Sequence, residues 1–107
     1  MMLTLPIKKK WFDMILSGEK KEEYREKTRY YRGRFRMYLG MYRCSPEEEW
    51  KKRKAVVRFR NGYAASSPSF TAVCTIDIGP GREEWGAEPG KEYYRLKILE
   101  IREEAQP

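Results

Sequence analysis

The chain has 107 residues, of which 40% are hydrophobic, 14% aromatic and 36% charged, and its formal net charge at pH 7 is +7. This length predicts a single domain with a modest core, and the aromatic content excludes a fully disordered chain. The absence of histidine excludes imidazole-based nucleophilic catalysis and removes the commonest metal ligand. The excess of positive charge favours an anionic partner such as nucleic acid; charge that serves only solubility is the alternative.

No targeting or membrane segment stands out in the sequence. The N-terminus lacks the apolar run of about 7–15 residues that a signal peptide carries, and no stretch approaches the roughly 20 apolar residues of a membrane span. We therefore expect a cytoplasmic protein that does not enter a membrane. Cys44 and Cys74 match no zinc or redox spacing. We expect two reduced thiols, with Cys74 buried in a strand, and neither a metal nor a cofactor.

The first elements along the chain are predicted to be a strand, a helix and a second strand. Residues 2–7 alternate in character and end near Pro6, which is typical of a short strand. Residues 8–17 carry apolar side chains at helical spacing, and we expect these to pack into the core. Gly18 then ends the helix, because glycine enters the left-handed region without steric cost. Residues 20–25 are predicted to form the second strand.

Charged residues gather where this second strand begins. Successive side chains of a strand point to opposite faces, so Glu23 and Arg25 are expected to share a face, with Lys20 beside them. Such a group favours a polar cleft that binds a base edge or a phosphate; the alternative is a salt-bridge network that fixes the helix to the sheet. A buried lysine can also act as a base when its pKa is lowered, whereas a neighbouring carboxylate keeps it charged.

Residues 27–36 form a basic, aromatic segment without an acidic residue, and its helical character is uncertain from sequence because Gly33 interrupts it. Cations bind phosphates, flat rings stack on bases, and arginine can do both. The segment is therefore the predicted nucleic-acid surface, and a surface helix anchored by its aromatic rings is the alternative. The cations expected to contact the ligand are Arg29, Arg32, Arg34 and Arg36.

The rest of the chain is predicted to consist mainly of strands. Residues 38–43 are expected to be partly buried, and a short helix is expected from the Ser45-Pro46 cap to the basic run 51–54. Strands are predicted at residues 55–61, 70–78 and 93–101, separated by a turn at Asn61-Gly62, a break at 79–81 and a loop at 86–90. Residues 103–107 are predicted to be a polar tail.

Late strands without intervening helices favour a mixed α+β domain with an antiparallel sheet. Short strands separated by glycine and proline turns are typical of a small barrel or a curled sheet. Strict alternation in the last strand predicts Ile98 and Glu100 on one face, with Leu99 and Ile101 on the other. No linker divides the chain, so residues 1–107 are predicted to be one domain.

The run from Pro6 to Arg25 resembles the opening of ASCH domains, which are relatives of the PUA fold. Their signature, Gly-x-Lys-x-x-Glu-x-Arg after an amphipathic helix, is matched by Gly18, Lys20, Glu23 and Arg25. Segments 58–63 and 84–86, with Pro89-Gly90 before the last strand, resemble a small single-domain subgroup found in bacterial and phage genomes. The resemblance spans nearly the whole chain. It implies a PUA-like β-barrel of about five to six mostly antiparallel strands, flanked by two or three helices.

The resemblance also implies a cleft lined by the signature residues and an association with RNA. Some single-domain relatives are similar to amidohydrolases that remove the acetyl group from acetylated cytidine with a lysine, a threonine and a glutamate; other relatives are ribonucleases. The lysine corresponds to Lys20, and the nucleophilic threonine corresponds to Glu23. Because a carboxylate does not replace a hydroxyl as acyl acceptor, this difference favours recognition over acyl transfer.

The leading hypothesis is therefore an RNA- or nucleotide-binding domain with a Lys20, Glu23 and Arg25 cleft. Arg58, Asn61 and Tyr63 are expected to complete that cleft, since asparagine pairs with base edges, tyrosine stacks and arginine binds phosphate. The alternative is a hydrolase acting on RNA or on a modified nucleoside, with Lys20 and Glu23 as its catalytic residues. A third hypothesis is a phage-borne interaction protein that binds a host factor.

Overall fold

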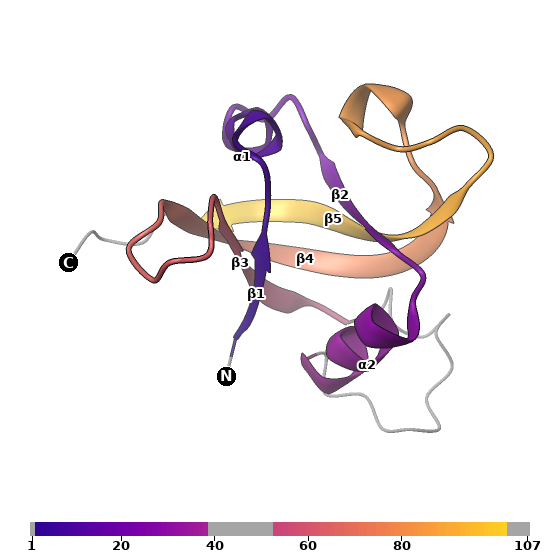
Figure 1. Ribbon diagram of the computed structural model, residues 1–107, viewed down its shortest axis with the longest axis horizontal. Coiled ribbons are helices and arrows are strands. Elements are labelled where there is room, and N and C mark those ends of the chain that lie inside the picture. Colours follow the sequence, from indigo (N-terminus) through magenta and orange to yellow (C-terminus); the bar gives the residue numbers. More distant parts are fainter. Residues whose placement is uncertain (1, 39–52, 103–107) are drawn as a thin grey trace.

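The computed structural model describes residues 2–38 and 53–102 (Figure 1). The elements in chain order are β1 (Leu3–Pro6), α1 (Lys9–Leu16), β2 (Glu22–Glu26), α2 (Arg29–Tyr38), β3 (Ala55–Arg60), β4 (Ser69–Pro80), a short 3-10 helix η2 (Glu83–Trp85) and β5 (Glu92–Arg102). The predicted strands and the first helix are confirmed within these residues, and the basic segment forms a helix across Gly33. The predictions for residues 39–52, including Cys44 and the helix from Ser45, and for the tail 103–107 lie outside the described residues.

The strands form one mixed sheet in the order β1-β3-β4-β5-β2. All neighbouring pairs are antiparallel except β1 and β3, which are parallel, with Leu3 opposite Val57 and Leu5 opposite Phe59. The expected α+β domain with a curled, mostly antiparallel sheet is confirmed for the described residues. The sheet curls into a half-barrel, so the edge strands β1 and β2 both cross in front of β4 and β5 in Figure 1.

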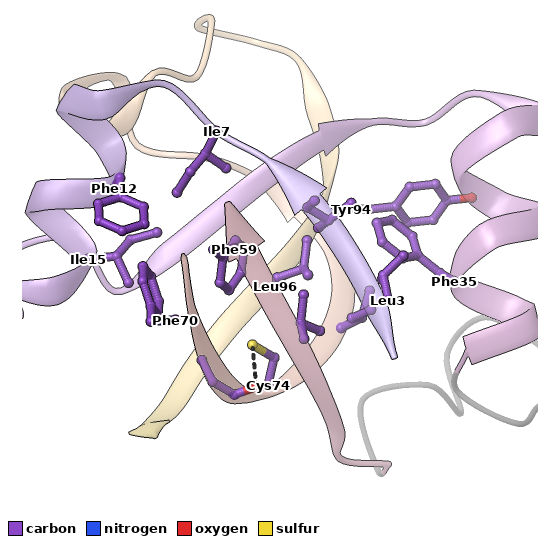
Figure 2. Close-up of a cluster of buried hydrophobic side chains, with 14 residues drawn as sticks. Leu3, Ile7, Phe12, Ile15, Phe35, Phe59, Phe70, Cys74, Tyr94 and Leu96 are labelled. Carbon is purple, nitrogen blue, oxygen red and sulfur yellow. Dashed lines mark hydrogen bonds between the residues drawn. The ribbon is translucent and has the colours of Figure 1, made fainter. Parts of the chain in front are cut away.

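The hydrophobic core fills the inside of the curled sheet, between the two α-helices (Figure 2). Phe12 of α1 meets Phe70 of β4 with their ring centroids 5.0 Å apart. Phe35 of α2, whose side chain is fully buried, meets Tyr94 of β5 edge to face at 5.3 Å. Each fully buried apolar side chain of this size contributes about 1.5–3 kcal/mol of transfer free energy. The apolar stripe predicted on the first helix is confirmed in part: Phe12 and Ile15 pack into the core, whereas Leu16 is 39% exposed.

The predicted strand break at residues 79–81 is wrong at its first residues, because β4 continues through Gly79 to Pro80. Gly79 pairs with Tyr93 across the β4–β5 ladder. A Cβ atom at Gly79 would lie 2.6 Å from Cζ of Arg95. The glycine therefore makes room for a guanidinium that crosses the strand, and proline is tolerated because it is the last residue of the strand.

Strict alternation along the last strand is also wrong, because β5 contains a bulge. Cys74 pairs with Ile98 whereas Val73 pairs with Glu100, so Leu99 has no partner in the ladder. The extra residue reverses the faces beyond it. As a result Ile98 and Ile101 both pack against the core, while Leu99 is 52% exposed.

Cys74 is fully buried in β4, as predicted. Its thiol lies 3.8 Å from the carbonyl oxygen of Ala72, a contact drawn in Figure 2. Burial raises the pKa of this thiol to about 12. Cys74 is therefore a protonated core residue at neutral pH, without the thiolate that reactive cysteines need.

The helices that the structure describes are short. Helix α1 has 8 residues and α2 has 10. Within residues 2–38 and 53–102, no helix has the length and apolar character needed to cross a membrane.

Candidate functional site

A cleft of about 620 Å³ is lined by both edge strands, by the starts of α1 and α2, and by the segments that follow β3 and form η2. This volume lies within the roughly 300–1,000 Å³ typical of small-molecule sites. Many of the lining residues are aromatic, namely Trp11, Tyr24, Tyr31, Tyr63, Trp85 and Tyr93; of these, Tyr24, Trp85 and Tyr93 are buried together in a second apolar cluster. The curl of the sheet thus gathers aromatic residues from distant parts of the chain around one cavity.

Glu23 and Arg25 form the floor of this cleft. Both line it, and Nη1 of Arg25 lies 2.7 Å from Oε2 of Glu23. Glu23 is only 5% exposed. The two residues point to the same face of β2 because they are separated by one position in a strand, so the shared face predicted from sequence is confirmed.

Lys20 completes a charged triad with these residues but lies behind the floor. Its Nζ is 3.1 Å from Oε1 of Glu23, and its side chain has no exposed surface. Local structure explains the placement: Gly18 adopts a φ of 86° after α1, and the amide of Lys20 donates to the carbonyl of Met14 at 2.9 Å. The chain therefore turns inward as β2 begins, and Lys20 contributes no surface to the cleft.

The Lys20 ammonium ties η2 to the triad. It donates to the carbonyl of Trp85 at 2.6 Å and lies over the rings of Trp11 and Tyr24, at 4.7 Å and 4.9 Å from their centroids. Burial lowers the pKa of Lys20, while the charge of Glu23 and the hydrogen bond to it raise the pKa. Lys20 is therefore a positioning residue: it fixes the backbone of Trp85, at one side of the cleft, relative to the Glu23 carboxylate.

Arg25 joins the two edge strands of the sheet. Its Nη2 donates to the carbonyl of Pro6 at the end of β1 at 2.7 Å, and its Nη1 also donates to its neighbour Tyr24 at 2.8 Å. Its guanidinium lies 6.0 Å from the ring centroid of Tyr31 on α2. Arg25 therefore bridges the open side of the half-barrel while presenting part of its guanidinium to the cleft.

The loop after β3 forms a rim of the cleft, which Asn61, Gly62 and Tyr63 line. Nδ2 of Asn61 donates to the carbonyl of Ile7 at 3.1 Å, which fixes the base of the loop. Gly62 has a φ of 126°, and a Cβ there would lie 2.6 Å from Oγ of Ser67. Tyr63 follows with 89% of its surface exposed. Asn61 therefore has a structural contact on its amide nitrogen, and Tyr63 presents a ring at the rim.

Arg58 is not brought to the cleft. In β3 the side chains of Val57 and Phe59 are fully buried, so Arg58 points to the opposite face of the sheet. There its Nη1 donates to Oγ of Ser69 at 3.0 Å. Arg58 is therefore not among the residues that line the cleft, because the apolar face of β3 carries Val57 and Phe59 into the core while the sequence did not show where the cleft lies relative to that face.

The predicted basic surface is only partly directed at the cleft. Arg29 and Arg32 are exposed in the first turn of α2, next to Tyr31, which lines the cleft. Arg34 instead lies over the rings of Tyr30 and Tyr38, at 5.7 Å and 5.2 Å from their centroids. Arg36 is half-buried toward the end of the helix. Only the first turn therefore combines exposed cations with a place at the cleft.

The reasoning from sequence missed the tryptophans of the cleft. Trp11 was placed in the core stripe of the first helix, but it is half-buried and lines the cleft. Trp85 lies in a short loop element that has no periodic pattern. Its sequence signal is the following glycine: Gly86 has a φ of 101°, and a Cβ there would lie 3.0 Å from Cζ2 of Trp11. A glycine required by close contact between the two walls therefore marks this side of the cleft.

Within the part of the chain that the structure describes, no group of carboxylates and thiols lies close enough together to hold a metal ion. Comparison with known proteins found no matching family model, curated protein or solved structure. The function of the cleft must therefore be inferred from its own chemistry.

Proposed function

We propose that this chain is an RNA- or nucleotide-binding domain of the ASCH type, with a PUA-like fold, and that its ligand binds in the cleft. The observation that carries the proposal is a buried, ion-paired carboxylate and guanidinium beneath aromatic rings in one cavity of about 620 Å³. Polar groups at fixed positions select a hydrogen-bonding edge, and rings bind the flat faces of the same ligand.

The floor supports recognition of a nucleobase edge. Each oxygen of Glu23 receives one charged donor, from Lys20 or from Arg25, and keeps a lone pair for another donor. Among the described residues, Arg25 donates to Glu23 and to the carbonyls of Tyr24 and Pro6. Because a guanidinium has further N–H groups, the floor offers an acceptor beside a donor. Base edges carry the same alternation of donors and acceptors.

The walls support binding of a flat ring. Trp11 and Tyr31 are half-buried and line the cleft, and Tyr63 stands exposed at its rim. Stacking of a base on an aromatic side chain contributes about 1–3 kcal/mol. The exposed cations of Arg29 and Arg32 beside Tyr31 supply the adjacent basic surface, which attracts phosphates.

A hydrolase is less well supported by the geometry. A catalytic Lys20 would have to reach the ligand, yet its side chain has no exposed surface and its ammonium already contacts Glu23 and the Trp85 carbonyl. Incubating the purified protein with RNA and with acetylated cytidine tests this alternative. Product formation that Lys20→Met abolishes would replace the binding proposal with the enzymatic one.

The proposal is tested by measuring binding of fluorescein-labelled RNA by anisotropy and of nucleoside monophosphates by calorimetry. Tyr63→Ala is the cleanest variant, because its exposed side chain contributes little to folding. We expect Tyr63→Ala to lose about 1–3 kcal/mol of binding free energy, Tyr63→Phe to retain it, and Leu99→Ala, an exposed residue outside the cleft, to bind like the wild type. Absence of saturable binding to any of these ligands would refute the proposal.

A further inference from the structure

Building on the proposed function, we propose that the cleft takes one unstacked nucleotide of a single RNA strand, and that the phosphates on its two sides lie on cations at the starts of α1 and α2. The inference goes beyond the presence of a binding site. The RNA strand would cross the cleft between the start of α1 and the start of α2, and an RNA duplex would not be a ligand.

The starts of both helices line the cleft. Lys8, directly before α1, marks what we call its α1 end, and Tyr31, in the first turn of α2, marks its α2 end. Strand β2 runs between the two helices in Figure 1, and its residues 23–26 line the cleft along its length. At the rise of an extended strand, β2 covers about 13 Å. A single phosphate cannot neutralise cations at both ends, whereas successive phosphates of one strand can.

The start of α1 is basic, and its first turn carries no acidic residue. Lys8, Lys9 and Lys10 are all exposed. Lys9 is neutralised by Asp13 at 2.7 Å. Lys8 has its place on the cleft, and Nζ of Lys10 lies over the Trp11 ring at 4.7 Å from its centroid. Lys8 and Lys10 therefore place positive charge directly beside an aromatic wall.

The start of α2 is also basic. Arg29 is exposed, and the first turn of α2 also lacks an acidic residue. The acid nearest to this end along the chain is Glu26, which ends β2 and forms an ion pair with Lys91 at 3.0 Å. Its charge is therefore balanced. Lys8 thus lines the cleft at one end, and Arg29, two residues before the lining residue Tyr31, adds an exposed cation near the other end. This arrangement suits a ligand that is anionic on both sides of the bound ring.

The depth and walls of the cleft favour a single strand. A ring that contacts Glu23, which is 5% exposed, must leave the stack of its neighbours. Bases in a duplex are paired and stacked, whereas those of single-stranded loops and ends can turn outward and stack on aromatic side chains. Tyr63, 89% exposed at the rim, would also collide with a continuous stack of base pairs laid over the opening.

The test compares three ligands: a labelled single-stranded RNA of mixed sequence, the same RNA annealed to its complement, and nucleoside monophosphates. Affinity is measured over a series of salt concentrations for the wild type, Lys8→Gln, Arg29→Gln and their combination. Lys21→Gln is the matched control, because Lys21 is exposed and lies outside the cleft. Each of the three substitutions removes an exposed charge and leaves the core unchanged.

We expect the single strand to bind more tightly than a monophosphate or the duplex. Each phosphate contact contributes about 0.7 to the slope of log affinity against log salt for single strands. Lys8→Gln and Arg29→Gln should each lower the slope by about that amount, and their effects should add, while Lys21→Gln leaves it unchanged. The effect of Tyr63→Ala should persist in the double variant, because stacking and phosphate contacts are separate.

Two results would overturn this path while leaving the proposed function intact. One is duplex binding as tight as that of the single strand. The other is monophosphate binding as tight as that of the RNA, with a salt slope that neither Lys8→Gln nor Arg29→Gln changes. Failure of the proposed function looks different: neither monophosphate nor RNA binding would then respond to Tyr63→Ala.

Discussion

Glu23→Gln tests whether the charged triad is an enclosed unit in which the Glu23 carboxylate stabilises both cations. The substitution keeps the shape of the side chain and removes its charge. Lys20 Nζ would then be left with the Trp85 carbonyl at 2.6 Å and with the like charge of Arg25 nearby, while its side chain stays fully enclosed. Removing one partner of a buried ion pair costs about 3–5 kcal/mol. That is a large part of the roughly 5–15 kcal/mol by which a small domain is stable.

The loss should depend on pH in a direction that the structure fixes. Burial lowers the pKa of Lys20 from its ordinary 10.5, whereas Glu23 raises it, so without the carboxylate the pKa falls further. Between that lowered pKa and 10.5 the unfolded chain binds more protons than the folded chain, and the free energy of unfolding therefore rises with pH. Glu23→Gln should regain stability as the pH is raised toward 10.5, and Glu23→Gln combined with Lys20→Met should lose this dependence.

The assay is urea unfolding followed by tryptophan fluorescence, with the midpoint and the slope fitted separately. Glu26→Gln is a matched control in the same strand, since Glu26 also lies 3.0 Å from a lysine but in an exposed pair. Such pairs contribute little because water screens them, so this variant should unfold like the wild type. If Glu23→Gln and Glu26→Gln have equal effects, the triad is not enclosed and the reasoning about the floor of the cleft is wrong.

Three further predictions concern the rest of the fold. Gly81→Ala should destabilise the protein by about 1–3 kcal/mol in thermal unfolding, because the new Cβ would lie 2.6 Å from that of Ala87; an unchanged melting temperature would contradict it. Cys74→Ala should flatten the loss of stability at alkaline pH: the pKa of the thiol is raised from 9.0 to about 12 in the fold, so the unfolded chain loses its proton first and unfolding becomes easier above pH 9.0. Asp77→Asn should shift acid unfolding toward neutral pH. Burial opposes ionisation of Asp77, but Arg95 outweighs this effect and lowers the pKa of the carboxyl. The wild type therefore keeps the stability from this carboxylate until the pH falls through the lowered pKa, and below that pH the two proteins should have the same stability.

Local sequence patterns were sufficient to predict most of the helices and strands and part of the candidate site. Helical spacing of apolar residues identified α1, period-two alternation identified the strands, and Gly18 correctly marked the end of the first helix. The shared face of Glu23 and Arg25 follows from the geometry of any strand, and the ion pair of 2.7 Å agrees with it. These features depend on neighbours within a few residues, which is the range over which sequence periodicity carries information.

The remaining features of the fold and of the candidate site depend on contacts between segments that are distant in the sequence. Alternation identifies the apolar face of β3, with Val57 and Phe59, but not where the cleft lies relative to it, so Arg58 was assigned to the cleft although it contacts Ser69 on the other face. The bulge at Leu99 likewise depends on how β5 pairs with β4. The roles of Lys20 and Arg25 emerge only when the sheet curls, bringing the carbonyl of Trp85 to Lys20 and that of Pro6 to Arg25. The sequence alone therefore determined which charged groups stand together. The tertiary structure decided that Lys20 is enclosed while Glu23 and Arg25 line the cleft, because burial is a property of the assembled walls.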